Sequence, residues 1–359
     1  MVTDSLTLND VIARVRSFGI RGYLALATIL FLVFIGLVGV FNPESNLGAL
    51  FDILTDESTL SSALRLSVPI AFAALGGIFA EKSGVINIGL EGLLIIAAFF
   101  GVYATDVTGS VWLGMGAGVL ASTLLSGLFG IVCIKYKADQ IIAGLAVWLI
   151  ALGLAPFLSQ VIYDGPNTSS VESLGTLTIP YLSEIPFFGA LFDASPIVYL
   201  MFVAVAASWY TLNRTSFGRW VIASGENPKA LDTAGVNVSR VRYAAVLLSG
   251  VLSGIGGAAL SLSLGQFIGN GATMVNGKGF IAIVAYLFGN YNPIGAMLST
   301  LLFAGLEAVQ IALQVGDVFA IPQSLVRTIP YISVVIVLAL VGHTRLPKAA
   351  GEYYESGEE

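Results

Sequence analysis

The sequence predicts an all-α membrane protein that crosses the bilayer about ten times, and three observations support this fold class. Hydrophobic residues make up 56% of the 359 residues, charged residues only 11%, and the mean hydropathy is +0.89. Soluble domains carry roughly twice that charged fraction. The apolar residues gather in runs of about 20, the length that a helix needs to cross the hydrocarbon core. No pair of segments with alternating polarity competes with the helical interpretation.

Ten runs are expected to be the membrane-spanning helices. Six are long and apolar enough by themselves: 22–41, 111–134, 141–162, 196–212, 244–264 and 293–315. Four shorter or less pure runs complete the set: 60–80, 88–105, 280–291 and 325–342. The run 280–291 is the weakest, because Asn292 and Pro293 follow it directly. The first run is too long for a signal peptide and is not followed by a small-residue cleavage site.

Basic residues set the expected orientation, because Lys and Arg in short loops stay on the cytoplasmic side of a membrane. With ten crossings and both termini inside, thirteen of the sixteen Lys and Arg residues fall inside. Only Arg65, Lys278 and Arg327 fall outside, each close to the end of a span. The connection 163–195 holds four acidic residues and no Lys or Arg, as an external loop does. The sequence therefore predicts a multi-pass protein of the plasma or inner membrane with both termini in the cytoplasm.

The chain is expected to form one transmembrane domain over 1–359. A cytoplasmic segment at 1–21 precedes a helical bundle at 22–342, and a cytoplasmic acidic tail follows at 343–359. We interpret helices 2–5 and 7–10 as an inverted repeat, because the second span runs inward, the seventh runs outward, and three more follow each.

Both halves contain a Gly-rich stretch, SGVINIGLEG at 83–92 and NGATMVNGKGF at 270–280. Such backbone is tolerated at membrane depth only where protein or water covers it. Ordinary loops at the membrane surface are the alternative. Gly250, Gly254 and Gly257, with Ala258, form a small-residue stripe that is suited to close helix packing.

The composition excludes several classes of protein. A net charge of −6 argues against a nucleic-acid-binding chain, and the low charged fraction argues against a soluble enzyme. The one cysteine, Cys133, excludes a disulfide framework, and the one histidine, His343, leaves little for a metal site. No catalytic residues, metal or cofactor are expected.

Two carboxylates lie within apolar sequence, Glu91 in IGLEGLLII and Glu307 in LFAGLEAVQIAL. A charge near the centre of a bilayer costs at least ~2.5 kcal/mol, so such residues usually face the interior of a bundle or an aqueous cavity. Gln310 follows Glu307 by three residues and shares its helix face. We expect Asn87, Glu91, Glu307 and Gln310 to line or gate a polar path for a substrate. A structural polar cluster that pins two helices, and a position of Glu91 near the cytoplasmic interface, remain as alternatives.

The cytoplasmic connection 213–243 contains a short capped helix of about two turns. Asn227 is a good N-cap, Pro228 suits the first helical position, and Gly235 provides the C-terminal stop. The residues at helical spacing between them are Ala230, Leu231 and Ala234. Because so short a helix is marginal alone in water, we expect it to dock into a groove on a cytoplasmic partner. A surface helix that rests on its own bundle is the alternative.

Three stretches together resemble the permease subunits of ABC importers, in the branch that serves ribose, other simple sugars, nucleosides and branched-chain amino acids. They are SGVINIGLEG at 83–92, ASGENPKALDTAGVNVSRVRY at 223–243 and GKGFIAIVAYLFGNYNPIGA at 277–296. The resemblance runs from roughly 60 to 342, and EKSGVINIGLEG is most similar to the nucleoside-uptake branch. The chain departs from the family in its acidic tail and its low lysine content.

The resemblance implies the ten-helix fold of type II importers and a transport subunit that is not an enzyme. It implies cytoplasmic ATPase subunits, an extracellular substrate-binding lipoprotein, and a second permease that is either a paralogous chain or a second copy. The implied substrate is a nucleoside or a simple sugar. The resemblance also implies that 225–235 is the coupling helix seated in the ATPase. The residues with this implied role are Gly225, Glu226, Asn227, Pro228, Ala230, Ala234 and Gly235.

Two other function classes compete with the importer. A secondary carrier driven by protons or sodium would use Glu91 or Glu307 and would need no ATPase. A membrane scaffold or receptor is disfavoured, because the connection 163–195 is too small for a folded ligand-binding domain.

Overall fold

The computed structural model describes residues 33–316 and 345–355, together with the single positions 325, 328, 332 and 335. Several predicted segments lie wholly or partly outside these residues. The first span, 22–41, is described from Val33 onward, and the tenth, 325–342, only at those single positions. The predicted N-terminal segment at 1–21 and the last residues of the tail, 356–359, are not described either.

Seven of the described helices are long and apolar enough to cross a membrane, which confirms a polytopic membrane protein. They are α4 (Glu57–Lys82), α5 (Leu90–Thr108), α6 (Val111–Gly130) with the π-helical turn η1 (Ile131–Lys135), α7 (Gln140–Tyr163), α8 (Pro196–Arg214), α11 (Val238–Leu264) and α13 (Pro293–Gly316). Their ends lie within three residues of the predicted spans, except that α11 begins six residues earlier, at Val238.

Two predicted spans look different in the structure. The run 280–291 is the helix α12 (Lys278–Phe288), whose 11 residues reach only about 16 Å at 1.5 Å per residue. Such a helix is too short to cross a membrane alone. The described part of the first span, Val33–Phe41, is followed by α3 (Asn46–Thr55) at an angle of 110°.

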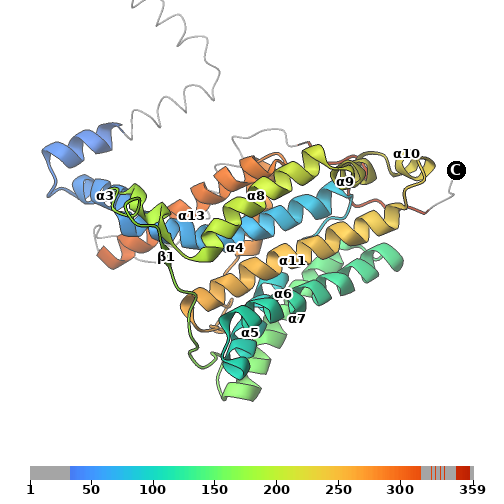
Figure 1. The fold of residues 1–359 in the computed structure, drawn as a ribbon, viewed down its shortest axis with the longest axis horizontal. Coiled ribbons are helices and arrows are strands. Elements are labelled where there is room, and N and C mark those ends of the chain that lie inside the picture. Colours follow the sequence, from blue (N-terminus) through green and yellow to red (C-terminus); the bar gives the residue numbers. More distant parts are fainter. Residues whose placement is uncertain are drawn as a thin grey trace, which may run out of the picture.

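The core of the bundle lies along α4, α5 and α11, which are buried over most of their length, whereas only about a third of α6, α7 and α8 is buried. Helices α4 and α11 run side by side in Figure 1. They approach closely at Gly76, where an added Cβ would lie 2.9 Å from the Ser249 carbonyl oxygen.

The small-residue stripe on α11 has the packing role that the sequence predicts. A Cβ on Gly254 would lie 2.7 Å from Val119 Cα of α6, and one on Gly257 would lie 2.3 Å from the Leu94 carbonyl oxygen of α5. Hydroxyl groups add to this contact, since Ser122 Oγ of α6 donates to the Gly250 carbonyl oxygen at 2.8 Å. The glycines let the backbones of three helices meet, as small residues do in membrane bundles.

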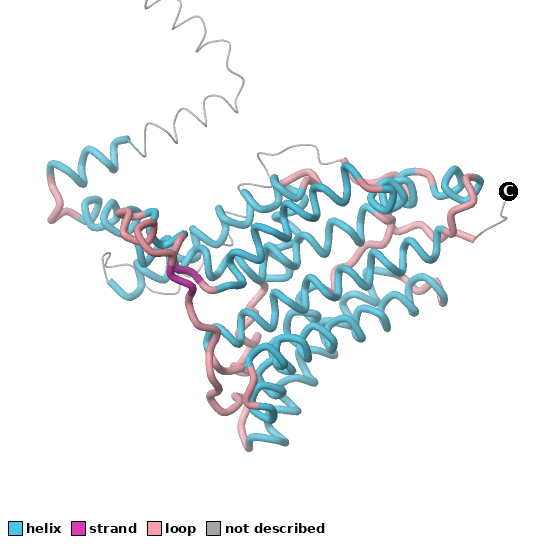
Figure 2. The backbone as a smooth tube through the Cα atoms, viewed as in Figure 1, coloured by secondary structure: helices cyan, strands magenta, loops and turns pink. Residues whose placement is uncertain are grey.

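Different connections cover the two ends of α8. After α8 come α9 (Ser216–Glu226), which was not predicted, and α10 (Pro228–Thr233), and we call this the α10 end of the bundle. Before α8 comes the connection 164–195, with β1 (Leu177–Thr178) and β2 (Asp193–Ala194) paired antiparallel and the 3-10 turn η2 (Phe188–Leu191). Figure 2 shows this strand pair against a chain that is otherwise helix and loop where it is described. We call this second end the strand end.

Candidate functional site

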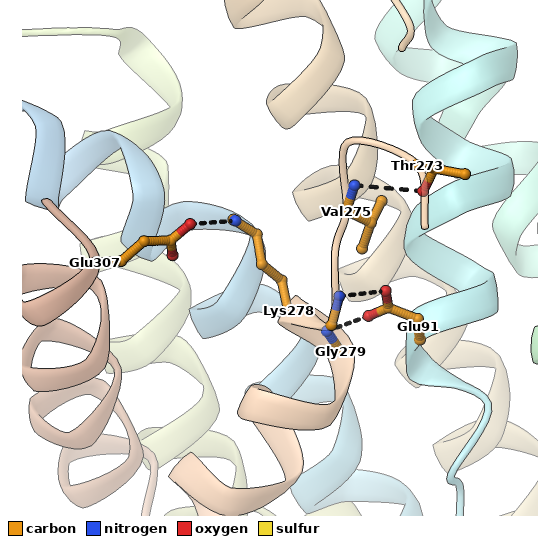
Figure 3. Close-up of polar contacts among 7 residues, drawn as sticks. Glu91, Thr273, Val275, Lys278, Gly279 and Glu307 are labelled. Carbon is orange, nitrogen blue, oxygen red and sulfur yellow. Dashed lines mark hydrogen bonds and ion pairs between the residues drawn. The ribbon is translucent and has the colours of Figure 1, made fainter. Parts of the chain in front are cut away.

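Helices α5 and α12 begin inside the bundle. Asn87, three residues before α5, donates from Nδ2 to Ser249 Oγ at 3.1 Å, and Ser249 lies near the middle of α11. Lys278, the first residue of α12, is only 4% exposed. The N-terminal ends of the two helices meet there, and we call the contact between Glu91 and residues 277–279 the crossing (Figure 3).

Glu91 of α5 caps the start of α12. One carboxylate oxygen accepts a hydrogen bond from the Gly277 amide at 2.7 Å, and the other accepts from the Gly279 amide at 2.6 Å. The first amides of a helix have no partner within the helix, and the helix dipole favours a negative charge near them. Both oxygens of a carboxylate that is 2% exposed are thereby satisfied from another segment of the chain.

Gly279 makes this short contact possible. A Cβ on Gly279 would lie 2.3 Å from the backbone nitrogen of Glu91 and 2.4 Å from its Cα. Real Cβ atoms do not approach backbone so closely, so the two helix starts must separate if this residue carries a side chain. Gly277 precedes it with a φ of +84°, which an L side chain rarely adopts.

Lys278 reaches away from Glu91 toward α13. Its Nζ lies 2.7 Å from Glu307 Oε1 (Figure 3), and the pair is largely buried, with the Glu307 side chain 17% exposed. The other oxygen of Glu307, Oε2, is buried and has no hydrogen-bond partner among the residues that the structure describes. The segment 277–279 thus links two carboxylates, Glu91 through its backbone and Glu307 through the lysine.

The four residues predicted to form a polar path therefore lie in one region but do not form one cluster. Glu91 and Glu307 lie on either side of Lys278. Asn87 is tied to α11, and its Oδ1 also accepts from the Gly89 amide at 3.1 Å. Gln310 is buried on α13, one turn after Glu307. Glu91 is buried inside the bundle, and its alternative position near the cytoplasmic interface stays a prediction.

Sequence reasoning missed the part that Lys278 plays. It was expected only as an external residue close to the end of a span, and the structure shows that its side chain is buried and paired with Glu307. A lysine flanked by two glycines and followed by the apolar run FIAIVAYLF was the available signal.

A second buried carboxylate, also missed, lies on the way from the crossing to the α10 end. Glu81, near the end of α4, accepts from Tyr286 Oη at 2.5 Å and from Tyr291 Oη at 2.6 Å. Both oxygens are satisfied, so the group fixes the last turn of α12 to α4. Glu81 lies in the continuous run FAEKSG, and its sequence neighbours do not reveal the two tyrosines.

The short helix α10 has the caps that the sequence predicts. Asn227 Oδ1 accepts from the Ala230 amide at 3.0 Å, Pro228 holds the first position, and Gly235 follows the helix with a φ of +79°. Leu231 is buried against the bundle, whereas Ala230 is exposed.

The predicted coupling helix needs two corrections, one to its range and one to the face on which Leu231 lies. Gly225 and Glu226 belong to α9, which ends at Glu226, so 225–235 is not one continuous helix. Gly225 is also buried, and a Cβ there would lie 2.3 Å from the Lys82 carbonyl oxygen. Leu231 is not on the outward face with Ala230 and Ala234, because it packs on the chain's own bundle. α10 thus rests on the bundle by one side and presents the other.

The chain matches known proteins over most of its length. The family model described as branched-chain amino acid transport system, permease component, matches residues 59–340. The nucleoside ABC transporter permease protein NupC of Lactococcus lactis subsp. cremoris (strain MG1363) is 38% identical over 306 residues, which are 82% of this chain and 96% of that protein. The guanosine ABC transporter permease protein NupQ of Bacillus subtilis (strain 168) is 35% identical over 83% of this chain and 96% of its own length.

A third relative bears a different substrate in its name. The putative glucose ABC transporter permease protein TsgC13 of Haloferax volcanii (strain ATCC 29605) is 34% identical over 71% of this chain and 77% of its own length. No solved structure matches the chain. The range matched by the family model includes the crossing and α10, and the chain belongs to the family of branched-chain amino acid transport system permease components.

Proposed function

We propose that this chain forms the translocation path of an ABC importer for nucleosides, with simple sugars as the alternative substrate class. The relatives are permease subunits, so the chain is a transport component and not an enzyme. The observation that carries the substrate class is that relatives named for nucleoside and guanosine transport match 82% and 83% of this chain. The relative named for glucose, which matches 71%, keeps simple sugars as the second candidate.

The proposed architecture has ten spans, with an inverted repeat of helices 2–5 and 7–10 and with both termini in the cytoplasm. The positions of α5 and α12 support the repeat. Each follows a long buried helix, α4 or α11, and an irregular stretch, and each begins inside the bundle. Interfaces between such repeats are where transporters of this kind place their substrate path.

The proposed path uses Asn87, Glu91, Glu307 and Gln310 in two ways. The polar side-chain atoms of Asn87 and Glu91 are hydrogen-bonded to backbone amides and to Ser249, so these two residues fix the shape of the crossing. Within the described part of the chain Glu307 Oε2 has no partner, and the Gln310 amide lies on the same face of α13. We propose that these two groups bind the hydroxyls or ring amines of a nucleoside.

The coupling role of α10 and its caps, with Gly225 and Glu226 at the end of α9, is the second part of the proposal. α10 would seat in a cytoplasmic ATPase by its exposed side, which carries Ala230 and Ala234. Its movement would pass to the stretch before α5, because Ser224 Oγ of α9 donates to the Ser83 carbonyl oxygen at 2.8 Å. A docked partner can shift the equilibrium between outward and inward states only through contacts that differ in the two states.

The remaining partners follow from the same assignment. A second permease, paralogous or identical, would complete the path, and an extracellular lipoprotein would deliver the substrate at the strand end. The connection 163–195, which lies at that end, contains four acidic residues and no Lys or Arg. In this arrangement the strand end is external and the α10 end is cytoplasmic, as the distribution of basic residues predicts.

The docking of α10 is tested by adding bulk or charge to its exposed side. Ala230→Trp and Ala234→Glu are expected to abolish uptake while the amount of protein in the membrane stays unchanged. Ala230→Ser and Ala234→Ser, which add little bulk and no charge at the same exposed positions, are the controls and are expected to transport normally. Normal uptake by both Ala230→Trp and Ala234→Glu would overturn the docking role.

The ion-driven carrier is the competing hypothesis. Its candidate residues, Glu91 and Glu307, already have partners within the protein. Both carboxylate oxygens of Glu91 accept hydrogen bonds from backbone amides, and one oxygen of Glu307 forms an ion pair with Lys278. We expect uptake to persist when the ion gradient is dissipated and ATP is held constant. Collapse of uptake under those conditions would favour the carrier.

A further inference from the structure

The described residues 345–355, which we call the C-terminal strap, lie across the α10 end of the bundle. They follow the last residue matched by the family model, which ends at 340. Ala349 in the strap is 3% exposed, so this segment is packed on the bundle.

Two backbone hydrogen bonds fix the strap to separate elements. The Ala349 amide donates to the Gly225 carbonyl oxygen of α9 at 2.8 Å. The Gly351 amide donates to the Gly84 carbonyl oxygen, in the stretch before α5, at 3.0 Å. The strap therefore bridges the helix that leads into α10 and the segment that leads into the crossing.

Side chains hold the second half of the strap next to α10. Arg242 of α11, which is 4% exposed, donates from Nη1 to the Glu352 carbonyl oxygen at 2.7 Å. Tyr354 Oη donates to Asp232 Oδ2 of α10 at 2.9 Å. Glu355 pairs with Lys137, just after η1. Fixing a backbone costs conformational entropy, and these contacts offset that cost over the strap.

Between these anchors the strap presents an aromatic side chain. Tyr353 is 46% exposed, although Glu352 and Tyr354 on either side of it are anchored. A second tyrosine, Tyr136, is exposed beside Lys137, the partner of Glu355. Tyrosine is enriched in protein interfaces because its ring gives contact area and its hydroxyl keeps a hydrogen bond.

α10 alone is too small for a stable interface. Its six residues span about 9 Å, while a specific interface buries roughly 800 Å² on each partner. A subunit that docks on α10 must therefore contact its neighbours too. The strap is hydrogen-bonded to α10 through Asp232, so it lies next to that helix.

We propose that the C-terminal strap is part of the surface on which the ATPase subunit docks, with Tyr353 as its contact residue. This inference rests on the proposed coupling role of α10. It makes the docking surface a composite of α10, which comes from the middle of the chain, and the strap, which comes from its end. Movement of the docked subunit then reaches Gly84 through the strap as well as through α9.

Photo-crosslinking in the intact complex tests the strap. A benzophenone amino acid is placed at Tyr353, at Lys229 of α10, or at Tyr181, which is 85% exposed at the strand end. Illumination is expected to capture the ATPase subunit from 353 and from 229, with a yield at least tenfold above that from 181.

The outcomes separate this inference from the proposed function. Capture from 229 and not from 353 overturns the strap's part in docking and leaves α10 as the coupling helix. Capture from neither position overturns both. As a second measurement, Tyr353→Ala is expected to weaken binding of the ATPase subunit to the permease about tenfold, whereas Tyr181→Ala leaves it unchanged. Unchanged binding in Tyr353→Ala also overturns the proposal.

Discussion

Lys278 and Glu307 show how a charged residue is retained inside an apolar bundle. Lys278 Nζ and Glu307 Oε1 are 2.7 Å apart, and both side chains are largely buried. Removing one partner of a buried pair leaves an uncompensated charge. That loss typically costs about 3–5 kcal/mol, whereas replacing both partners by apolar residues is often neutral. The two possible roles of this pair, structural and functional, therefore make different predictions.

We expect Lys278→Met to lower the thermal stability of the purified complex strongly, because Glu307 loses its ion-pair partner. The double variant Lys278→Met/Glu307→Leu is expected to regain stability but not uptake, if Glu307 faces the path. Thermal unfolding and nucleoside uptake are measured on the same preparations. Recovery of uptake in the double variant would show that the pair is structural only.

A second prediction concerns Glu91. Glu91→Gln keeps the size of the side chain, but its amide group can accept from only one of the Gly277 and Gly279 amides. Hydrogen bonds to a charged group contribute about 1.5–3 kcal/mol, so we expect a loss of that order in unfolding measurements. Glu172→Gln, at an exposed position of the strand end, is the control and is expected to be within about 0.5 kcal/mol of the unmodified protein. Equal stability of the two variants would contradict the capping role.

At the scale of the elements, the short helix α12 depends on its contact with α5. In the sequence the apolar run 280–291 is the weakest of the predicted spans, because it ends at Asn292. The structure agrees, since α12 has only 11 residues. What stabilises α12 is its N-terminal cap from Glu91 and its last turn against Glu81. Neither partner is a neighbour in the sequence.

We expect Gly279→Ala to disrupt this contact, because the added Cβ would lie 2.3 Å from the Glu91 backbone nitrogen. Overpacking of this kind costs typically 1–3 kcal/mol. Gly153→Ala on α7 is the matched control, since an added Cβ there meets nothing within 4 Å. Detergent-solubilised protein is compared by thermal unfolding and by uptake in vesicles. A Gly279→Ala variant that behaves like Gly153→Ala would mean that the helix starts can separate without loss.

At the scale of the whole molecule, the orientation is the prediction that decides how the two ends are used. The single cysteine, Cys133, is buried and is replaced by serine to give a cysteine-free background. Cysteines are then introduced at Lys229 and at Thr176, which are exposed at opposite ends. A membrane-impermeant maleimide added outside intact cells is expected to label position 176 and not 229. Labelling of 229 alone would reverse the topology.

Several features could be predicted from the sequence because they depend on local pattern. Helix length and apolar content fix the seven long described helices to within a few residues, and local capping residues fix α10 through Asn227 and Gly235. The stripe at Gly250, Gly254 and Gly257 predicts close packing, because only small residues leave room for another backbone. The family resemblance predicts the class of transport subunit, and the relatives agree.

Other features came only from the tertiary structure. The sequence places Glu91 and Glu307 in apolar runs, but the contact of both with residues 277–279 depends on how α5 and α13 pack against the start of α12. The strap's contacts with Gly84, Gly225 and Asp232 likewise join residues more than a hundred positions apart. Periodicity and capping depend on a few neighbouring residues and can be recognised in the sequence. A hydrogen bond between remote segments forms only when the helices have packed into the folded bundle.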